Sequence, residues 1–141
     1  MIKSILMTTL MAGLLACTAQ QSPDKEDVEN AIMKFAKAGD ENDVQKLSQV
    51  LDPNYRIVMN QLFGNTATVI IDRAAYLSKI ESKEWGGDKR VVNVLKVDVN
   101  GNNASAKVEM VGEKMTMTSY FLLVKDVNGK WKLVTDLPTV G

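Results

Sequence analysis

Two turn sequences in the C-terminal half, Asn100-Gly101 and Gly112-Glu113, constrain the fold of this 141-residue chain more than any other feature. Both lie between runs of alternating hydrophobic residues, and Asn-Gly is the strongest short signal for a two-residue β-hairpin loop. Because side chains alternate between the two faces of a strand, each turn also predicts which residues share a face. The two registers agree on one apolar face, made of Val91, Asn93, Leu95, Val97, Ala104, Ala106, Val108, Met110, Met115, Met117, Ser119 and Phe121. We therefore predict consecutive antiparallel hairpins with this face buried, and with Lys107 and Glu109 on the reverse face.

The third turn, around Asn128-Gly129, permits two registers that differ by one residue. A two-residue loop pairs Leu123 with Val134. A three-residue loop with Gly129 as the bulge residue pairs Leu123 with Leu133 instead. We prefer the three-residue loop because it places Trp131 and Leu133 on the apolar face, where burying both contributes about 3 to 6 kcal/mol.

The N-terminal half is largely helical by pattern, which together with the hairpins makes the domain an α+β fold. Ser22-Pro23 combines a capping residue with a helix-starting proline, and hydrophobic residues then follow at helical spacing. Asp72 has the position of a second such cap. The predicted elements are, in order, a helix from Pro23 to Gly39, a helix over residues 42–51, strands over 55–63 and 66–71 around Gly64-Asn65, and a short helix after Asp72.

An apolar run over residues 5–16 follows Lys3 and ends in Leu14-Leu15-Ala16-Cys17. The run is shorter than the about 20 residues that a spanning helix needs, but it is typical of the core of a signal peptide. The small residue before the cysteine and the polar residues after it resemble the lipobox of a bacterial lipoprotein. We therefore expect cleavage before Cys17 and lipidation of that residue. The alternatives are an ordinary secretory signal or a buried N-terminal helix with an incidental cysteine.

This interpretation divides the chain into a cleaved signal peptide (1–16), a short lipidated tether (17–22) and a single domain (23–141). The lipid would hold the domain on a membrane of the bacterial cell envelope. Thr18, rather than an aspartate, follows the cysteine. This resembles the sorting pattern of outer-membrane lipoproteins, so we expect the outer membrane if the host has two membranes.

Composition excludes several classes of chemistry. The chain has no histidine, which excludes Ser-His-Asp and Cys-His catalysis and the usual zinc sites. Lys+Arg and Asp+Glu both number 17, so the formal net charge is zero and no basic surface favours nucleic acid. Cys17 is the single cysteine, so a lipidated protein has no disulfide. We expect no cofactor and no metal, and carboxylates and tyrosines are left as the groups able to transfer protons.

Three segments, DRAAYL (72–77), KVDVNGNNASAKV (96–108) and NGKWKLV (128–134), resemble the lumazine-binding branch of the nuclear transport factor 2-like superfamily. The resemblance implies a cone-shaped, cystatin-like α+β fold, in which three N-terminal helices pack on a curved antiparallel sheet. The name of the branch implies ligand binding rather than turnover. Asp52-Pro53 stands where members of this branch often carry His-Pro, so whatever that histidine contributes is missing here.

In such a cone the first helix and the concave sheet face enclose a pocket. Asn93 and Ser119 are the polar residues that interrupt the predicted apolar face, and tyrosines are expected to present hydroxyls at the mouth. The competing interpretation is that Asn93 bonds locally or to a buried water and that the methionines fill an irregular core. The candidate ligand-binding residues are Tyr55, Asn93, Met117, Ser119 and Phe121.

Three functions are compatible with this pattern. The first is a lipid-anchored envelope protein that binds a small apolar molecule, a peptide or a protein partner without turnover. The second is a histidine-free enzyme resembling the isomerases and polyketide cyclases of this fold, with Asp72 or Asp98 as base and Tyr55 as oxyanion donor. The third is an assembly module that forms homodimers through the outer sheet face, which includes Thr116, Thr118 and Tyr120.

Overall fold

The computed structural model describes residues 22–141, which form three helices and one six-stranded sheet. The helices are α1 (Pro23–Asp40), α2 (Val44–Val50) and α3 (Arg73–Glu81). The strands are β1 (Leu51–Asn60), β2 (Thr68–Asp72), β3 (Val91–Asn100), β4 (Asn103–Val111), β5 (Thr116–Lys125) and β6 (Trp131–Val140). Within this part of the chain, no helix combines the length and the apolar character that crossing a membrane requires. The predicted cleavage site and Cys17 lie outside the described residues.

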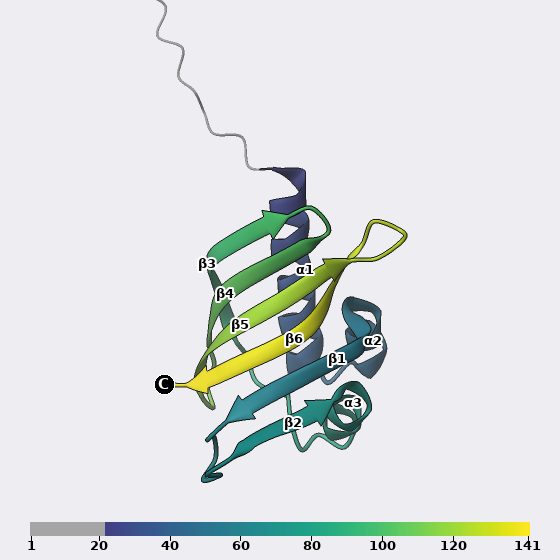
Figure 1. Ribbon diagram of the computed structural model, residues 1–141. Helices are drawn as coiled ribbons and strands as arrows, with labels where there is room; N and C mark the ends of the chain where they lie inside the picture. Colours follow the sequence, from purple (N-terminus) through teal and green to yellow (C-terminus); the bar gives the residue numbers. More distant parts are fainter. Residues whose placement is uncertain (1–21) are drawn as a thin grey trace, which may run out of the picture.

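The sheet is mixed, which corrects the expectation of a wholly antiparallel one. Its order is β2-β1-β6-β5-β4-β3, and β1 runs parallel to β6 while each other neighbouring pair is antiparallel. The β1–β2 hairpin therefore adds two strands next to β6, at the edge of the sheet opposite β3. Figure 1 shows α1 crossing one face of the sheet, with α3 beside β1 and β2.

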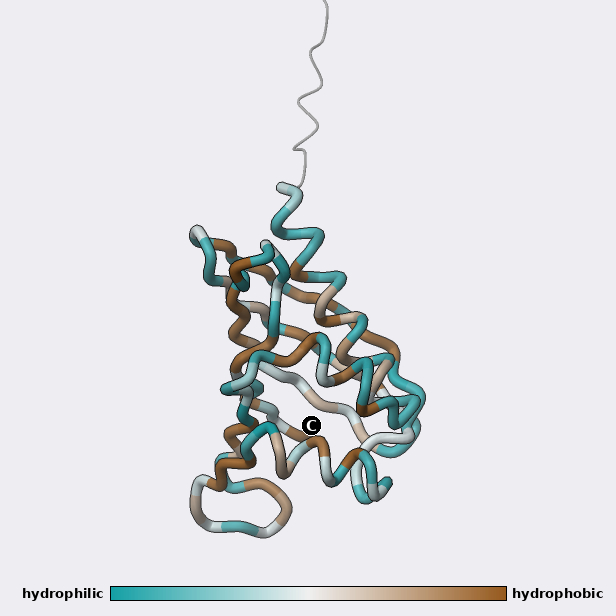
Figure 2. Tube along the Cα trace, turned by 90° about the vertical axis from the view of Figure 1, so that its right-hand side faces the viewer, coloured by the Kyte–Doolittle hydropathy of each residue, from teal (hydrophilic) through white to brown (hydrophobic). Residues whose placement is uncertain are grey.

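Local sequence explains where the helices begin and end. The Ser22 side chain accepts a hydrogen bond from the Lys25 backbone N–H at 3.4 Å, and α1 ends at Asp40, close to the predicted end. Figure 2 shows hydrophobic positions interrupting the hydrophilic turns of α1, as expected of a helix buried on one side. Asp72 caps α3, because its carboxylate accepts from the Ala75 N–H at 2.8 Å. The predicted caps of α1 and α3 are confirmed.

The core lies between α1 and the inner face of the sheet. Its centre is an aromatic cluster in which Phe35 of α1 contacts rings from both the sheet and α3. Ring centroids are 5.4 Å apart for Phe35 and Phe121, 6.2 Å for Phe35 and Tyr76, and 5.4 Å for Tyr55 and Tyr76. Such pairs stabilise the fold beyond the area that they bury.

The β1–β2 hairpin has a wider loop than the sequence predicts. β1 begins at Leu51 and ends at Asn60, and β2 begins only at Thr68, so residues 61–67 form the loop. Leu62 and Phe63 in this loop line a pocket. The hairpin therefore contributes part of the pocket wall as well as two strands of the sheet.

The hairpin between β4 and β5 is confirmed, with a register that differs by two residues. Gly112 N–H donates to the Met115 carbonyl at 3.0 Å, so the loop spans residues 112–115, and Val108 pairs with Ser119 instead of Met117. A shift of two residues leaves each side chain on its predicted face. Val108 is fully buried, as predicted, while Lys107 on the reverse face is half-buried.

The β3–β4 hairpin contains a β-bulge that the turn sequence does not reveal. Val97 pairs with Ala106 and Val94 pairs with Val108, so Leu95 is an unpaired extra residue in β3. The extra residue reverses the faces of the strand before it. Leu95 is 55% exposed and Asn93 is also exposed, so the prediction that both face the interior is wrong. The prediction for Val91 fails for the same reason, because it too is exposed.

The β5–β6 hairpin adopts the preferred three-residue loop. Leu123 pairs with Leu133, Gly129 has a φ of 77°, and Trp131 is buried together with Leu133, all as predicted. Leu122 then pairs with Thr135, so Val134 is a second unpaired residue. This bulge places an aspartate two residues further along β6, Asp136, inside the domain.

Candidate functional site

A pocket of about 220 Å³ opens at the end of the domain where α1 finishes. Its walls come from α1, α3 and the segment after it, from β1, β4, β5 and β6, and from the β1–β2 and β4–β5 loops, and they are mainly apolar. The apolar lining includes Phe35, Ile57, Met59, Tyr76, Met110 and Met117. Apolar walls with a few polar groups are typical of small-molecule sites.

The acidic residue placed inside by the second bulge, Asp136, lines this pocket. Asp136 is 6% exposed, and its Oδ1 atom has no hydrogen-bond partner among the described residues. Burial raises the pKa of its carboxyl from 3.8 to about 7, against the opposing effects of the Ser119 hydroxyl and the Arg90 charge. A buried carboxyl that titrates near neutral pH is a recognised mark of a functional site.

Two further hydroxyl groups near Asp136, in addition to that of its chain neighbour Thr135, lack partners among residues 22–141. They are the phenol of Tyr55 and the hydroxyl of Ser119, and both are buried. Burial, and next the charge of Asp136, raise the pKa of Tyr55 well above its ordinary value. Burial likewise raises the pKa of Tyr76, so both phenols stay protonated and able to donate hydrogen bonds.

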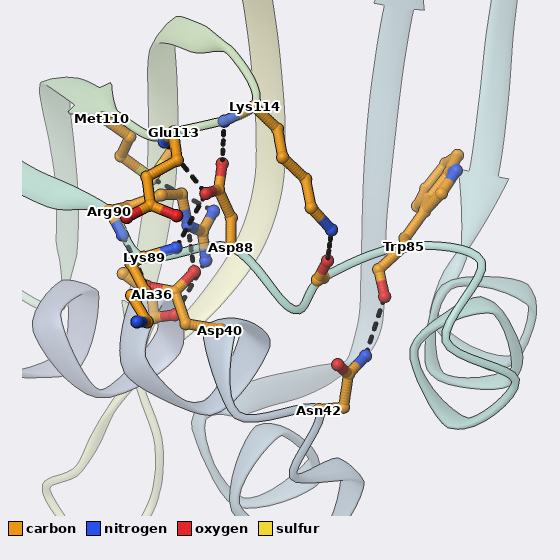
Figure 3. Close-up of polar contacts among 11 residues, drawn as sticks. Ala36, Asp40, Asn42, Trp85, Asp88, Lys89, Arg90, Met110, Glu113 and Lys114 are labelled. Carbon is orange, nitrogen blue, oxygen red and sulfur yellow. Dashed lines mark hydrogen bonds and ion pairs between the residues drawn. The ribbon is translucent and has the colours of Figure 1, made fainter.

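Arg90 fixes the end of α1 against the pocket. Its Nη2 donates to the Ala36 carbonyl at 2.7 Å and its Nε donates to Asp40 Oδ1 at 2.5 Å, while its backbone N–H donates to Asp40 Oδ2 at 3.0 Å. Figure 3 shows the guanidinium between this helix end and Met110. The Arg90 and Asp40 side chains are only 11% and 16% exposed, so the guanidinium forms a largely buried ion pair that stabilises the fold.

A second set of polar contacts joins segments that line the pocket (Figure 3). Asp88 accepts hydrogen bonds from the backbone N–H groups of Glu113 and Lys114, at 3.0 and 3.2 Å, and thereby ties the β4–β5 loop to the segment after α3. Asn42 donates to the Trp85 carbonyl at 2.8 Å and ties the same segment to the turn after α1. The two contacts hold in place the segment after α3, which contributes Trp85 and Gly86 to the pocket lining.

The structure brings together some of the predicted ligand-binding residues and not others. Met117 lines the pocket, while Tyr55 and Ser119 are buried beside Asp136 behind the lining. Phe121 is fully buried and packs on α1 through the aromatic cluster. Asn93 lies outside on β3, where its side-chain amide donates to Glu109 Oε1 at 3.1 Å.

The two carboxylates considered as catalytic bases also lie away from the pocket lining. Asp72 is exposed and caps α3, and Asp98 is exposed on β3. The group that sequence reasoning missed is Asp136. Its charge within an apolar strand was visible, but only the bulge at Val134 turns it inward. Residues 22–141 contain no cluster of three metal-ligating side chains.

The helices on one face of a curved six-stranded sheet, with a pocket at the end of the cone, define the nuclear transport factor 2-like fold. Solved structures share it. A protein of this type and of unknown function from Shewanella baltica has a TM-score of 0.71 at 16% identity, covering 84% of this chain and 94% of that chain. A second, from Silicibacter pomeroyi, has a TM-score of 0.72 at 16% identity and covers 82% and 94%. A third, described as a putative dehydratase from Streptomyces avermitilis, has a TM-score of 0.64 at 17% identity and covers 84% and 96%.

The family is shown by the sequence. The family described as "Putative lumazine-binding" matches residues 23–137, and the chain belongs to it. No curated protein matches the chain.

Proposed function

We propose that the domain binds a small, mainly apolar ligand in the pocket beside α1 and that Asp136 orients this ligand. The observation that carries the proposal is a buried carboxyl on the pocket wall with an oxygen that lacks a partner among the described residues. An unpaired buried polar atom costs about 1 to 3 kcal/mol, and a ligand group bonded to it recovers that cost.

The pocket volume limits the size of the ligand. Drug-sized molecules occupy pockets of roughly 300 to 1,000 Å³, so a pocket of about 220 Å³ fits a compact molecule or one end of a larger one. The description of the family suggests a lumazine, a small flat heteroaromatic compound, as one ligand to test. The aromatic and methionine side chains of the wall favour such a shape.

A thermal-shift screen of small molecules against the full chain tests this proposal. Compounds that stabilise the wild type should stabilise Asp136→Asn less, with affinity reduced about tenfold or more. Met117→Trp, which fills the pocket, should abolish their effect, whereas Val127→Trp at the exposed tip of the β5–β6 loop should not. Ligands that stabilise all variants equally would bind elsewhere and contradict the proposal.

Proton transfer at Asp136 is a second candidate function. A carboxyl with a pKa near neutral pH both gives and takes protons efficiently. Asp136 therefore replaces Asp72 and Asp98 as the proposed base, with the Tyr55 phenol as hydrogen-bond donor. Product analysis with each binding compound tests it, because Asp136→Asn should abolish turnover in a protein that is folded and at least as stable as the wild type.

We also propose, from the sequence pattern, that the domain is anchored in the cell envelope through lipidated Cys17. The α1 helix of 18 residues, about 27 Å long, separates the tethered end of the domain from the pocket. A lipid anchor at one end would thus leave the pocket entrance, at the other end, free to meet its ligand.

A further inference from the structure

One charged group described in the pocket wall has an atom without a hydrogen-bond partner. Among the described lining residues, the two basic side chains are engaged: Arg90 with Asp40, and Lys114 with the Gly86 carbonyl at 3.2 Å. The other acidic lining residue, Glu84, accepts a hydrogen bond from Lys79 at 2.7 Å. Asp136 is the charged lining residue with an oxygen, Oδ1, that has no such partner among the described residues.

The surroundings of Asp136 are rich in aromatic rings. Phe35, Phe63, Tyr76 and Trp85 all line the pocket. The ring centroids of Tyr76 and Trp85 are 6.2 Å apart, as are those of Phe35 and Tyr76. Aromatic faces attract cations and also accept apolar groups. A carboxylate within aromatic walls can therefore bind an organic cation, with the carboxylate contacting the charged group and the rings contacting the apolar part.

We infer that the ligand is a small apolar amine whose ammonium group pairs with the Asp136 carboxylate while its apolar part packs on the aromatic wall. This inference rests on the proposed binding function and names the chemical class that the pocket takes. A buried anion without a partner is costly, and a ligand cation removes that cost. A ligand carboxylate would be repelled by the same group.

The inference has a characteristic pH dependence. The groups that face Asp136 are Arg90 and Asp40 at the end of α1, Tyr55 on β1, Tyr76 on α3 and Ser119 on β5, with Lys114 and Glu84 further out on the lining. The ion pair contributes no net charge and the tyrosines stay neutral, so Asp136 itself titrates. Because its pKa is about 7, the ionised fraction, and hence amine affinity, should rise about tenfold between about pH 6 and about pH 8.

Calorimetric titration of the full chain with matched probes tests the inference. The probes are benzylamine, phenethylamine and cyclohexylmethylamine, each compared with the alcohol and the carboxylate of the same skeleton. We expect the amines to bind about tenfold or more tightly than the alcohols at about pH 8, and to weaken about tenfold at about pH 6. Asp136→Asn should remove both the preference and the pH dependence. Asp98→Asn, which removes an exposed carboxylate on β3, should change neither.

The outcomes separate this inference from the binding function beneath it. Alcohols that bind as tightly as the amines, or affinity that rises as the pH falls, would show that a protonated Asp136 bonds a neutral ligand. That result overturns the amine class and leaves pocket binding in place. Binding by none of the probes, in a protein that also gives no hit in the thermal-shift screen, would overturn both.

Discussion

Asp136 on β6 lies opposite Phe121 on β5, one residue beyond the position that an unbroken ladder from the Leu123–Leu133 pair would reach. The unpaired Val134 accounts for the difference. As a result Thr135 and Asp136 are both buried, although neighbours in a regular strand face opposite sides. The pocket owes its buried acidic group to this single irregularity.

The titration of Asp136 should be visible in the stability of the protein. Its pKa is about 7 in the folded state and about 3.9 in the unfolded chain. The folded state holds the proton more tightly, so this group lowers stability as the pH rises from about 4 to about 7, by up to about 4 kcal/mol. Urea unfolding should show that the free energy of unfolding of Asp136→Asn increases relative to that of the wild type across this range. A difference that is constant with pH would mean that Asp136 is not buried as described.

The Arg90–Asp40 pair should contribute far more than an exposed ion pair. Arg90→Met leaves the Asp40 carboxylate partly buried without its partner, which should cost about 3 kcal/mol in the free energy of unfolding. The control is Lys37→Met, which breaks a pair with Glu41 in which the lysine is 75% exposed, and should cost about 0.5 kcal/mol or less. Denaturant unfolding of both variants measures the contrast, and equal costs would show that Arg90 is not anchored at the end of α1.

Two glycines with the same φ angle allow the effect of backbone strain to be distinguished from that of steric overlap. Gly64 and Gly86 both have a φ of 82°, so alanine at either position costs about 1 to 2 kcal/mol through backbone strain. A Cβ atom on Gly86 would also lie 2.4 Å from the Gly39 carbonyl oxygen, whereas one on Gly64 meets no atom within 4 Å. Gly86→Ala should therefore lower the melting temperature clearly more than Gly64→Ala. The opposite order would rule out this close approach at the pocket rim.

The outer sheet face should support the proposed homodimer. Beside Thr116 and Thr118 it exposes Tyr120, Leu122 and Leu137, which are neighbours across β5 and β6. Tyr120→Glu combined with Leu137→Glu should convert a dimer into a folded monomer in sedimentation experiments. Val127→Glu, at the fully exposed loop tip, is the matched control and should leave association unchanged. A wild-type protein that sediments as a monomer at high concentration would refute the homodimer.

The proposed lipid anchoring depends on Cys17. Cys17→Ser should yield an uncleaved or unacylated precursor, and the protein should no longer stay stably with the membrane fraction, because the acyl chains provide the anchoring energy. Fractionation and N-terminal analysis measure both effects. A wild-type protein that is released without detergent and begins at another residue would show that the lipobox interpretation is wrong.

Several features of the fold were predictable from sequence because they depend on residues close together in the chain. Capping by Ser22 and Asp72, the hairpins after β3 and β4, and the inward face of β4 follow from turn and cap chemistry and from strand alternation. The burial of Trp131 and Leu133 followed from choosing the register that hides the larger apolar area.

The tertiary structure decided what local rules cannot specify. An extra residue in a ladder has no distinctive sequence, yet the bulges at Leu95 and Val134 reverse the faces of the residues beyond them. The parallel pairing of β1 with β6 likewise joins segments far apart in the chain. Of the predicted ligand-binding residues, Met117 reached the pocket lining because its alternation was unbroken, whereas Asn93 was turned outward by the bulge in β3. Asp136, which the sequence pattern would leave facing solvent, became the buried acid of the pocket because sheet pairing, not local preference, determines on which side of a bulge a side chain lies.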